Sequence, residues 1–301
     1  MSMVIGSRGS ALALWQADWV RQRLEAAGHE IQIRKIQTTG DRLADAPLAH
    51  SGAKGLFIKE IEEALLERKI DLAVHSLKDL PTQQPEGLSI AAIPEREDAR
   101  DAFVARDGMS WEALPAGGRV GTSSLRRQSQ LLALRPDLKL VAMRGNIDTR
   151  LRKLDRGDCE GLVLASAGLR RLGFESRVTK FFSPEEMCPA VGQGALAIET
   201  RSDDANILEA VASLDHPPTH DAARAERAAL RELGGGCQLP IAAHAWQEAE
   251  CLRMVGVVAS PDGSKIFRAA ASGAREQPET LGRHVAEDLL KQGAGSVLQL
   301  S

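Results

Sequence analysis

The sequence has little that would indicate a membrane protein, a zinc site or a disulfide-stabilised fold. Its 301 residues include only four cysteines, none in a C-x-x-C pair: Cys159, Cys188, Cys237 and Cys251. This spacing is typical neither of a disulfide framework nor of a structural zinc site. No apolar run is long enough to cross a bilayer, and Met3–Arg8 lacks a charged-then-apolar signal pattern. We therefore expect a cytoplasmic protein that binds no metal and no membrane.

Aromatic residues and an excess of basic charge are also missing. The chain has no tyrosine, 3% aromatic residues and a net charge of −3. Nucleic-acid binding through base stacking and counterion release is therefore disfavoured, although Arg–Arg pairs occur. Neither a Walker loop nor a G-x-G-x-x-G sequence is present, so no nucleotide site is indicated. Any anion site has to be a local cluster of Arg and Lys.

What the sequence does contain is an alternation of strand and helix patterns. Up to residue 93, short apolar strand patterns alternate with helical patterns, such as Ala11–Ala27 and Phe57–Lys69. A charge-dense break at 94–101, a candidate hinge, precedes a similar alternation from Arg119 to Ala165. After about residue 215, a helix leads into three strand patterns and a final helix. This order predicts an α/β protein with two mostly parallel sheets and a small α+β domain with an antiparallel sheet.

One cysteine stands in an unusual setting. Gly234, Gly235 and Gly236 end the helical pattern Ala222–Leu233 and place Cys237 on backbone with little side-chain cover. A thiol that can be reached from a cavity can carry a group covalently. The alternative is that Cys237, like most free cysteines, is a small buried packing residue.

Arginines recur where predicted strands end. Arg8, Arg144 and the pairs Arg126–Arg127 and Arg170–Arg171 each follow a strand pattern. Ligands of open α/β sheets bind at the carboxyl ends of strands, so these side chains predict a cleft lined with guanidinium groups. Such a cleft suits a ligand with several carboxylates or phosphates. Each arginine alone could instead be solvated, and Ser124 could be an ordinary helix cap.

A second group of polar residues follows the strand pattern Asp71–His75. Ser76, Lys78 and Asp79 stand there, just before Leu-Pro. An ionised Asp79 beside a cationic cleft could stabilise a cationic intermediate or move a proton, and a turn-capping aspartate is the alternative. His75 itself is predicted to be structural. The long loop at 37–55, which contains Lys54, is typical of a lid, a binding segment or a tolerated surface insertion.

Together these segments resemble the porphobilinogen deaminase family, also called hydroxymethylbilane synthases. The resemblance covers essentially the whole chain and rests on eight motifs in order. They are S-A-L-A-L-W-Q at 10–16, K-G-L-F-I-K-E at 54–60, V-H-S-L-K-D-L-P at 74–81, E-R-E-D-A-R-D-A-F at 95–103, V-G-T-S-S-L-R-R-Q at 120–128, R-G-N-I-D-T-R-L at 144–151, P-A-V-G-Q-G-A at 189–195 and G-G-C-Q-L-P at 235–240. Two departures are Thr39, where an arginine often precedes the glycine, and Cys188 just before the seventh motif.

The resemblance implies a transferase that joins four porphobilinogen molecules head to tail, releasing ammonia at each step, to give the linear tetrapyrrole hydroxymethylbilane. A covalently bound dipyrromethane cofactor would prime the chain, and no metal would be needed. The fold implied is two domains like those of periplasmic binding proteins plus a small third domain. The predicted boundaries are 1–94 with a return segment at 195–213, 100–190, and 216–301. A monomer is expected, with porphobilinogen as its small-molecule partner.

By motif position, the resemblance assigns the catalytic role to Asp79 and the thioether link to Cys237. The other cofactor-binding residues would be Lys54, Ser76, Lys78, Thr122, Ser124, Arg126, Arg127, Arg144 and Gly145. The substrate-binding residues would be Arg8, Ser10, Phe57, Arg150 and Arg171. Each porphobilinogen carries an acetate and a propionate, which is consistent with a dense Arg and Lys lining in a protein of net charge −3.

A non-catalytic binding protein for a carboxylated or phosphorylated small molecule would use a similar cleft. Cys237 together with Asp79 discriminates between the two hypotheses, because a binding protein needs neither residue. The sequence therefore favours the enzyme.

Overall fold

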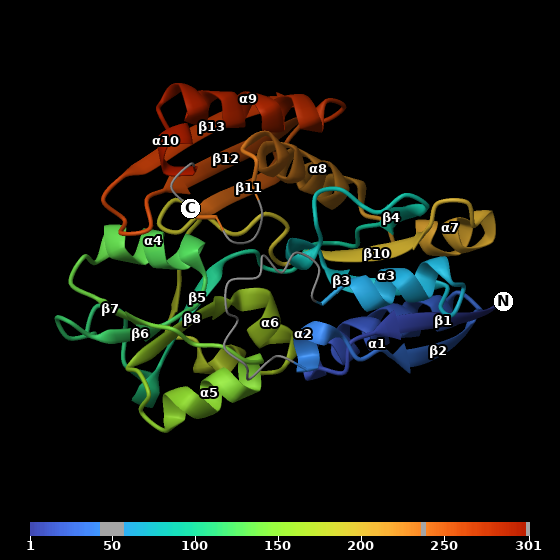
Figure 1. Ribbon diagram of the computed structural model, residues 1–301, viewed down its shortest axis with the longest axis horizontal. Coiled ribbons are helices and arrows are strands. Elements are labelled where there is room, and N and C mark those ends of the chain that lie inside the picture. Colours follow the sequence, from blue (N-terminus) through green and yellow to red (C-terminus); the bar gives the residue numbers. More distant parts are fainter. Residues whose placement is uncertain (43–56, 236–238, 299–301) are drawn as a thin grey trace. The chain divides into compact units, whose positions relative to one another are not determined.

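The computed structural model describes residues 1–42, 57–235 and 239–298 (Figure 1). The chain divides into two compact units. The first unit contains Met1–Arg96 and Ala195–His220, and the second contains Glu97–Gly194 and Asp221–Ser301. No helix in the described part of the chain is long and apolar enough to cross a membrane.

The first unit is built on a five-stranded sheet in which three neighbouring strands are parallel. The strand order is β2-β1-β3-β10-β4, with β1 parallel to β2 and β3, and β10 antiparallel to both of its neighbours. The strands are β1 (Ser2–Ser7), β2 (Glu30–Lys35), β3 (Leu72–Ser76), β4 (Leu88–Ala92) and β10 (Leu196–Arg201). The carboxyl ends of β1 and β3 therefore lie at one edge of this sheet, where the sequence places its polar residues.

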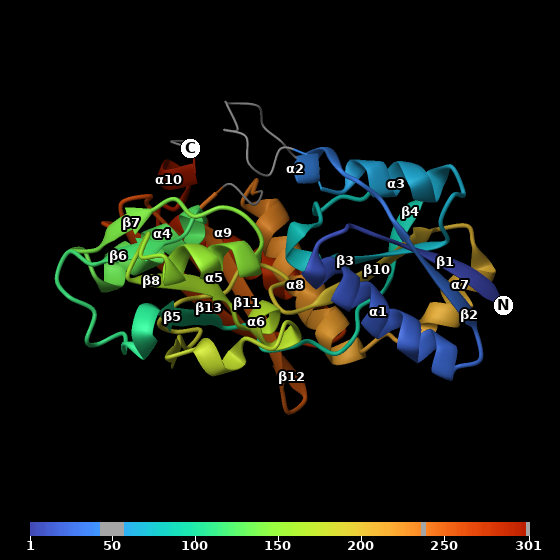
Figure 2. The same ribbon diagram turned by 90° about the horizontal axis from the view of Figure 1, so that it is seen from below.

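Helices cover both faces of the first sheet, as Figure 2 shows for α1 (Ala11–Ala26) and α3 (Lys59–Leu66). Val20 and Leu24 of α1 and Val211 of α7 (Ala205–Ala212) pack in one apolar cluster with residues of the sheet. On the other face, α3 packs through Ile61, Ala64 and Leu65 onto Ala73 and Leu88. The apolar residues at helical spacing thus form two layers of core, one on each side. The short helix α2 (Thr39–Arg42) precedes α3 in the chain.

The second unit contains a sheet with the same arrangement. Its order is β7-β6-β8-β5-β9, with β6 parallel to β7 and β8, and β5 antiparallel to β8 and β9. The strands are β5 (Asp101–Ala105), β6 (Arg119–Gly121), β7 (Lys139–Val141), β8 (Gly161–Ala165) and β9 (Lys180–Phe181). Leu131 of α4 (Leu125–Leu134) belongs to one apolar cluster, and α5 (Ile147–Asp155) and α6 (Ser166–Arg171) contribute to another.

The rest of the second unit is a three-stranded antiparallel sheet, β11 (Ile241–Glu248), β12 (Cys251–Ala259) and β13 (Ile266–Ala274). The helices α8 (Pro217–Glu232), α9 (Pro278–Lys291) and α10 (Gly295–Leu298) contribute to its core, and α9 runs along the sheet in Figure 1. The predicted fold class, two mostly parallel sheets with helices plus a small antiparallel sheet, is confirmed. The three domain boundaries stay a prediction.

One strand differs from the sequence-based expectation. The charge-dense segment 94–101 was predicted as a break, yet β5 begins inside it at Asp101. All five residues of β5 are buried, including the aspartate. A buried carboxylate needs compensating partners, and those partners lie in α4, far along the sequence. Local sequence pattern could not reveal them.

Candidate functional site

Arg8 lies directly after β1, and its guanidinium already has an anionic partner. Arg8 Nη2 donates to Asp41 Oδ1 over 2.6 Å, and the guanidinium lies 4.1 Å from the ring centroid of Phe57. Thr38 Oγ1 donates to the other oxygen of Asp41 over 2.7 Å. Burial acts to raise the pKa of Asp41, but hydrogen bonds from Arg8 and Thr38 outweigh it and the pKa is lowered. A substrate carboxylate at Arg8 would therefore share the guanidinium with Asp41, which the sequence analysis missed.

The end of β3 in the first unit carries Ser76, and Lys78 and Asp79 follow it. Ser76 Oγ accepts a hydrogen bond of 2.9 Å from Gln16 Nε2, and Gln16 is buried in α1. Residues Leu77–Asp79 form one turn of 3₁₀-helix, held by the buried side chains of its flanking leucines. Asp79 is exposed and Lys78 half-buried. The turn therefore leaves the side chain of Asp79 exposed between two buried leucines.

Hydroxyl groups follow β6 in the second unit. Ser124 is the N-cap of α4, where its Oγ accepts from the backbone N–H of Arg127 over 3.5 Å. Thr122 is buried, and its Oγ1 accepts from the backbone N–H of Ser124 over 3.2 Å. Ser10 plays the same capping part in the first unit, accepting from Ala13 N over 3.3 Å. Ser10 and Ser124 thus act as helix N-caps, and Thr122 binds the backbone just before α4.

Arg126 and Arg127, predicted to line a cleft, are instead buried around a single carboxylate. Arg126 Nη1 donates to Asp101 Oδ2 over 2.6 Å, and Arg127 Nε donates to Oδ1 over 2.9 Å. Burial acts to raise the pKa of Asp101, but the two guanidinium charges outweigh it and the pKa falls well below its ordinary value. Their binding of the cofactor stays a prediction, whereas their contact with Asp101 is observed.

The buried group carries more positive than negative charge. Two guanidinium groups share one carboxylate, and the neutral Gln193 completes the cluster by donating to Asp101 Oδ1 over 2.9 Å. The excess positive charge stands at the N-terminus of α4, where helix N–H groups also favour an anion. Neither Asp101 nor Gln193 was predicted as a site residue, although they lie inside the family motifs at 95–103 and 189–195.

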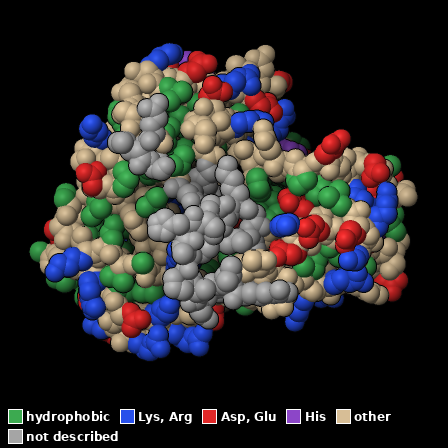
Figure 3. All heavy atoms as spheres, viewed as in Figure 1, with side chains coloured by type: hydrophobic (Ala, Val, Ile, Leu, Met, Phe, Trp, Pro, Cys, Tyr) green, Lys and Arg blue, Asp and Glu red, His purple; other side chains and the backbone are tan. Residues whose placement is uncertain are grey.

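Two further predicted residues follow β7. Arg144 is exposed. Gly145 has a φ of +106°, which a residue with a side chain rarely adopts, and its carbonyl accepts from Arg150 Nε over 2.7 Å. The turn thus brings Arg144 and Arg150 to the same strand end. Figure 3 shows Lys and Arg side chains gathered over the neighbouring helix α5.

The end of β8 is followed by α6 and its two arginines, which differ in their partners. Arg170 forms ion pairs with Glu97 at 3.0 Å and Glu175 at 2.8 Å. Arg171 Nη2 donates to the carbonyl of Gly194 over 2.7 Å. Burial lowers the pKa of Arg171 to about 10, with the charge of Glu97 opposing, so this side chain stays cationic at neutral pH.

The donor set fits a ligand with several carboxylates. Because β7, β6 and β8 are parallel neighbours, their carboxyl ends share one edge of the second sheet. Cationic or hydroxyl side chains follow each of these strands: Thr122, Ser124, Arg144, Arg150 and Arg171. Among residues 1–42, 57–235 and 239–298, no group of three His, Cys, Asp or Glu side chains could hold a metal ion.

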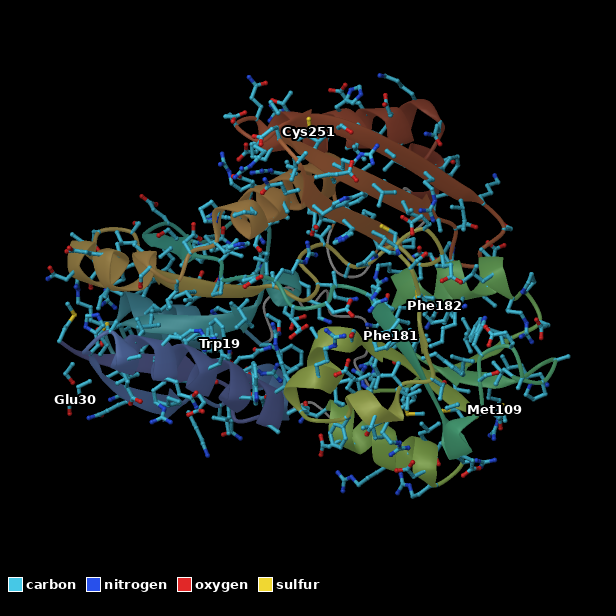
Figure 4. All side chains as sticks on the ribbon, turned by 180° about the vertical axis from the view of Figure 1, so that it is seen from behind. Trp19, Glu30, Met109, Phe181, Phe182 and Cys251 are labelled. Carbon is cyan, nitrogen blue, oxygen red and sulfur yellow. The ribbon has the colours of Figure 1, made fainter. Side chains whose placement is uncertain are left out.

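The cysteines that the structure describes are poor nucleophiles or lie on the surface. Burial raises the pKa of Cys159 to about 11 and that of Cys188 to about 12, so both thiols stay protonated at neutral pH. Cys251 is exposed at the start of β12 (Figure 4). Cys237 and Lys54 lie outside the described residues, and their roles rest on the motifs.

Comparison with known proteins agrees with the motifs. Residues 3–209 match the family description "Porphobilinogen deaminase, dipyromethane cofactor binding domain", and residues 221–291 match "Porphobilinogen deaminase, C-terminal domain". The chain is 52% identical over 297 residues to a porphobilinogen deaminase of Pelobacter propionicus, covering 98% of this chain and 96% of the relative. It is 54% identical over 299 residues to that of Desulforudis audaxviator, with the same coverage.

Solved structures with a similar backbone include a periplasmic substrate-binding protein of an ABC transporter from Coxiella burnetii. That similarity has a TM-score of 0.44 and 14% identity, and covers 75% of this chain and 96% of the other. A periplasmic binding protein with high arginine specificity from Salmonella typhimurium gives a TM-score of 0.40 at 15% identity, covering 71% and 91%. The family matches, which span most of the sequence, establish that this chain belongs to the porphobilinogen deaminase family.

Proposed function

We propose that the protein is a hydroxymethylbilane synthase, which joins four porphobilinogen molecules head to tail with release of ammonia. The observation that carries this proposal is the match of residues 3–209 to the family's dipyrromethane cofactor binding domain. The geometry supports it, because cationic and hydroxyl side chains follow all three parallel strands of the second sheet. We further propose that the protein works as a monomer in the cytoplasm.

Charge explains why such a protein needs so many arginines. Every porphobilinogen unit carries two carboxylates, so a chain of pyrroles becomes more anionic with each addition. Arg144, Arg150 and Arg171 would bind these carboxylates with charge-assisted hydrogen bonds. Arg8 and Ser10 would contact the incoming substrate in the first unit, and the ring of Phe57 would stack on a pyrrole.

The donor chemistry at these strand ends fits the cofactor that the family description names. When bound, dipyrromethane supplies a covalent pyrrole primer on which the product is built. Cys237 would hold it through a thioether, and Lys54 together with two sets of strand-end residues would bind its carboxylates. These residues are Lys54, Ser76, Lys78, Thr122, Ser124, Arg126, Arg127, Arg144 and Gly145.

Asp79 is the residue that we propose for catalysis. As ammonia leaves the substrate's aminomethyl carbon, positive charge develops on the substrate, and a fixed carboxylate stabilises that charge. The same carboxylate can accept the proton that the attacking pyrrole carbon loses. The 3₁₀ turn at Leu77–Asp79 suits this role, because it fixes the backbone of Asp79 beside the buried Leu77 and Leu80 and leaves its side chain accessible.

The proposal is tested by the intact mass of the denatured protein. The purified wild type is measured before and after incubation with porphobilinogen, beside Cys237→Ser and, as a matched control, Cys251→Ser, which changes an exposed cysteine. We expect an excess mass of two porphobilinogen units less the expelled ammonia in the wild type and in Cys251→Ser. Cys237→Ser should lack it.

The two incubations separate the alternatives. A wild type with no excess mass before incubation that gains it afterwards is an unloaded deaminase. A wild type that carries no excess mass either before or after incubation with porphobilinogen contradicts the proposal and leaves a non-catalytic binding protein. An excess that persists in Cys237→Ser would move the anchor to another residue.

A further inference from the structure

Arg8 uses only part of its guanidinium for contacts within the described part of the protein. Nε and Nη2, which form one side of the planar group, both donate to Asp41 Oδ1, over 3.1 Å and 2.6 Å. The central carbon Cζ lies over the ring of Phe57, 4.1 Å from its centroid. No described residue accepts a hydrogen bond from Nη1, and the side chain is 23% exposed. The end of the guanidinium that carries Nη1 and the second hydrogen of Nη2 is therefore open to a ligand.

Asp41 is held in place independently of Arg8. Its other oxygen, Oδ2, accepts from Thr38 Oγ1 over 2.7 Å and from the backbone N–H of Thr38 over 3.3 Å. In return, the backbone N–H of Asp41 donates to Thr38 Oγ1 over 3.2 Å. These reciprocal bonds form a capping box at the start of α2, and Thr38 is fully buried. The carboxylate of Asp41 would thus keep its position when Arg8 binds a second partner.

The short helix α2 is itself anchored. Thr39 donates to Glu60 Oε1 from its backbone N–H over 2.8 Å and from its hydroxyl over 2.5 Å, which ties α2 to α3. At Gly40, a Cβ would collide with the ring of Phe57, so the ring packs directly against the backbone of α2. One short helix therefore fixes both groups that contact the guanidinium, the carboxylate and the aromatic ring.

This arrangement leaves Arg8 one defined way to bind an anion. A carboxylate at the open end can accept from Nη1 and Nη2 together, which is a common geometry of arginine–carboxylate pairs. The approach through Nε is taken by Asp41. Because Thr38 also donates to Asp41, the guanidinium is not the sole partner of that carboxylate and can bind a second one.

Competition is the alternative. In that case Asp41 would occupy the position of a substrate carboxylate and would have to leave Arg8 before substrate binds. The capping box holds Asp41 in place, and the other end of the guanidinium is open, so the geometry favours orientation over competition.

We propose that Asp41 is a positioning residue, which orients Arg8 so that the open end of its guanidinium binds one carboxylate of the incoming porphobilinogen. The identity of that ligand rests on the proposed function, whereas the fixed orientation of Arg8 does not. An acidic neighbour lowers the net attraction of Arg8 for an anion. In exchange, the arginine is already ordered before the substrate arrives, so less conformational entropy is lost on binding.

The kinetic test compares Asp41→Asn with Asp204→Asn. Asparagine has one acceptor oxygen and one donor amide, so it cannot accept from both Thr38 and Arg8. Asp204 is a matched control in the same unit, because it also pairs with an arginine, at 2.7 Å, and accepts from an N–H of the helix that it caps. Asp204 follows β10, which runs antiparallel to β3, so it lies at the opposite edge of the sheet from Arg8.

We expect Asp41→Asn to raise KM for porphobilinogen about tenfold and to change kcat by less than about twofold. The reason is that Arg8 keeps its charge and loses its fixed orientation. Asp204→Asn should leave both constants unchanged, and intact mass confirms that each variant carries the covalent cofactor. A lower KM in Asp41→Asn would show competition, and an unchanged KM would show that Asp41 does not act on Arg8. Either result overturns the proposal.

Side-chain NMR tests the orientation of Arg8 without any substrate. A guanidinium held by Asp41 should show an Nε–H proton that exchanges slowly with water. This signal is assigned by its loss in Arg8→Lys, and it should lose protection in Asp41→Asn but not in Asp204→Asn. An unprotected Arg8 Nε–H in the wild type would overturn the fixed orientation. A wild type without turnover would contradict the proposed function, and the NMR result would still decide how Arg8 is held.

Discussion

Asp79→Asn is expected to lower the turnover of porphobilinogen by about 10²–10⁴-fold, the range that a positioned acid or base contributes. Asparagine has nearly the same shape but cannot carry a negative charge or accept a proton. Asp79 is exposed, and within the described part of the chain its carboxylate forms no hydrogen bond or ion pair. Its replacement should therefore change the free energy of unfolding by less than about 0.5 kcal/mol.

The measurement is single-turnover kinetics with porphobilinogen, combined with intact mass to confirm that the cofactor is present. Asp203→Asn is a suitable control, because it removes an exposed carboxylate from the same unit and only an exposed pair with Arg68. Near-normal turnover in Asp79→Asn would exclude this residue from the mechanism. Loss of the covalent mass in that variant would instead assign Asp79 to cofactor assembly.

Asp101→Asn is expected to destabilise the protein by about 3–5 kcal/mol, the usual cost of removing one partner from a buried ion pair. The side chain of Asp101 is fully buried, and its carboxylate compensates the charges of both Arg126 and Arg127. Without the carboxylate, two guanidinium groups remain in the core, and their other hydrogen-bond partners in the described part of the chain are two backbone carbonyls and Gln193. A loss of this size is a large part of the stability of an ordinary domain.

Urea unfolding of wild type, Asp101→Asn and Asp107→Asn would measure the effect. Asp107 is 84% exposed, so its substitution is a control for the chemical change alone. The lowered pKa of Asp101 sets the sign of the pH dependence. The stabilising charge is present above the ordinary value of 3.8, and the advantage of the wild type is lost only as pH falls below it. If the free energies of unfolding of wild type and Asp101→Asn differ by less than about 1 kcal/mol at neutral pH, the buried ion pairs of Asp101 contribute little to stability.

The fold was predictable where local pattern and burial agree. The helix Leu125–Leu134 was predicted with the bounds observed, because Ser124 caps it and apolar residues recur on one side. The strand β5 was missed because it begins with Asp101, a residue type that usually marks the surface. Burial of that aspartate depends on arginines 25 and 26 positions further along the chain.

For the site, the sequence predicted which residues stand at the ends of strands. Sequence placed Arg8, Asp79 and Arg171 after strands, and the structure places them there. It did not show that Arg8 is paired with Asp41, because an ion pair across 33 positions leaves no local trace. Likewise, His75 was predicted to be structural, but its bond to Glu199 spans 124 positions. Partners fixed by tertiary contact are the information that a single sequence lacks.

The place of β10 in the first sheet also constrains how the protein is made. β10 inserts between β3 and β4, pairing Leu196 with Ser76, although some 120 residues separate these strands. A ribosome releases all five strands of the second sheet, between Asp101 and Phe181, before it reaches Leu196. During that interval β3 lacks its antiparallel neighbour and presents an open edge, which is the kind of surface that joins other chains. The strand that leads to Asp79 is thus completed late, and nascent chains are most exposed to aggregation until residue 201 emerges.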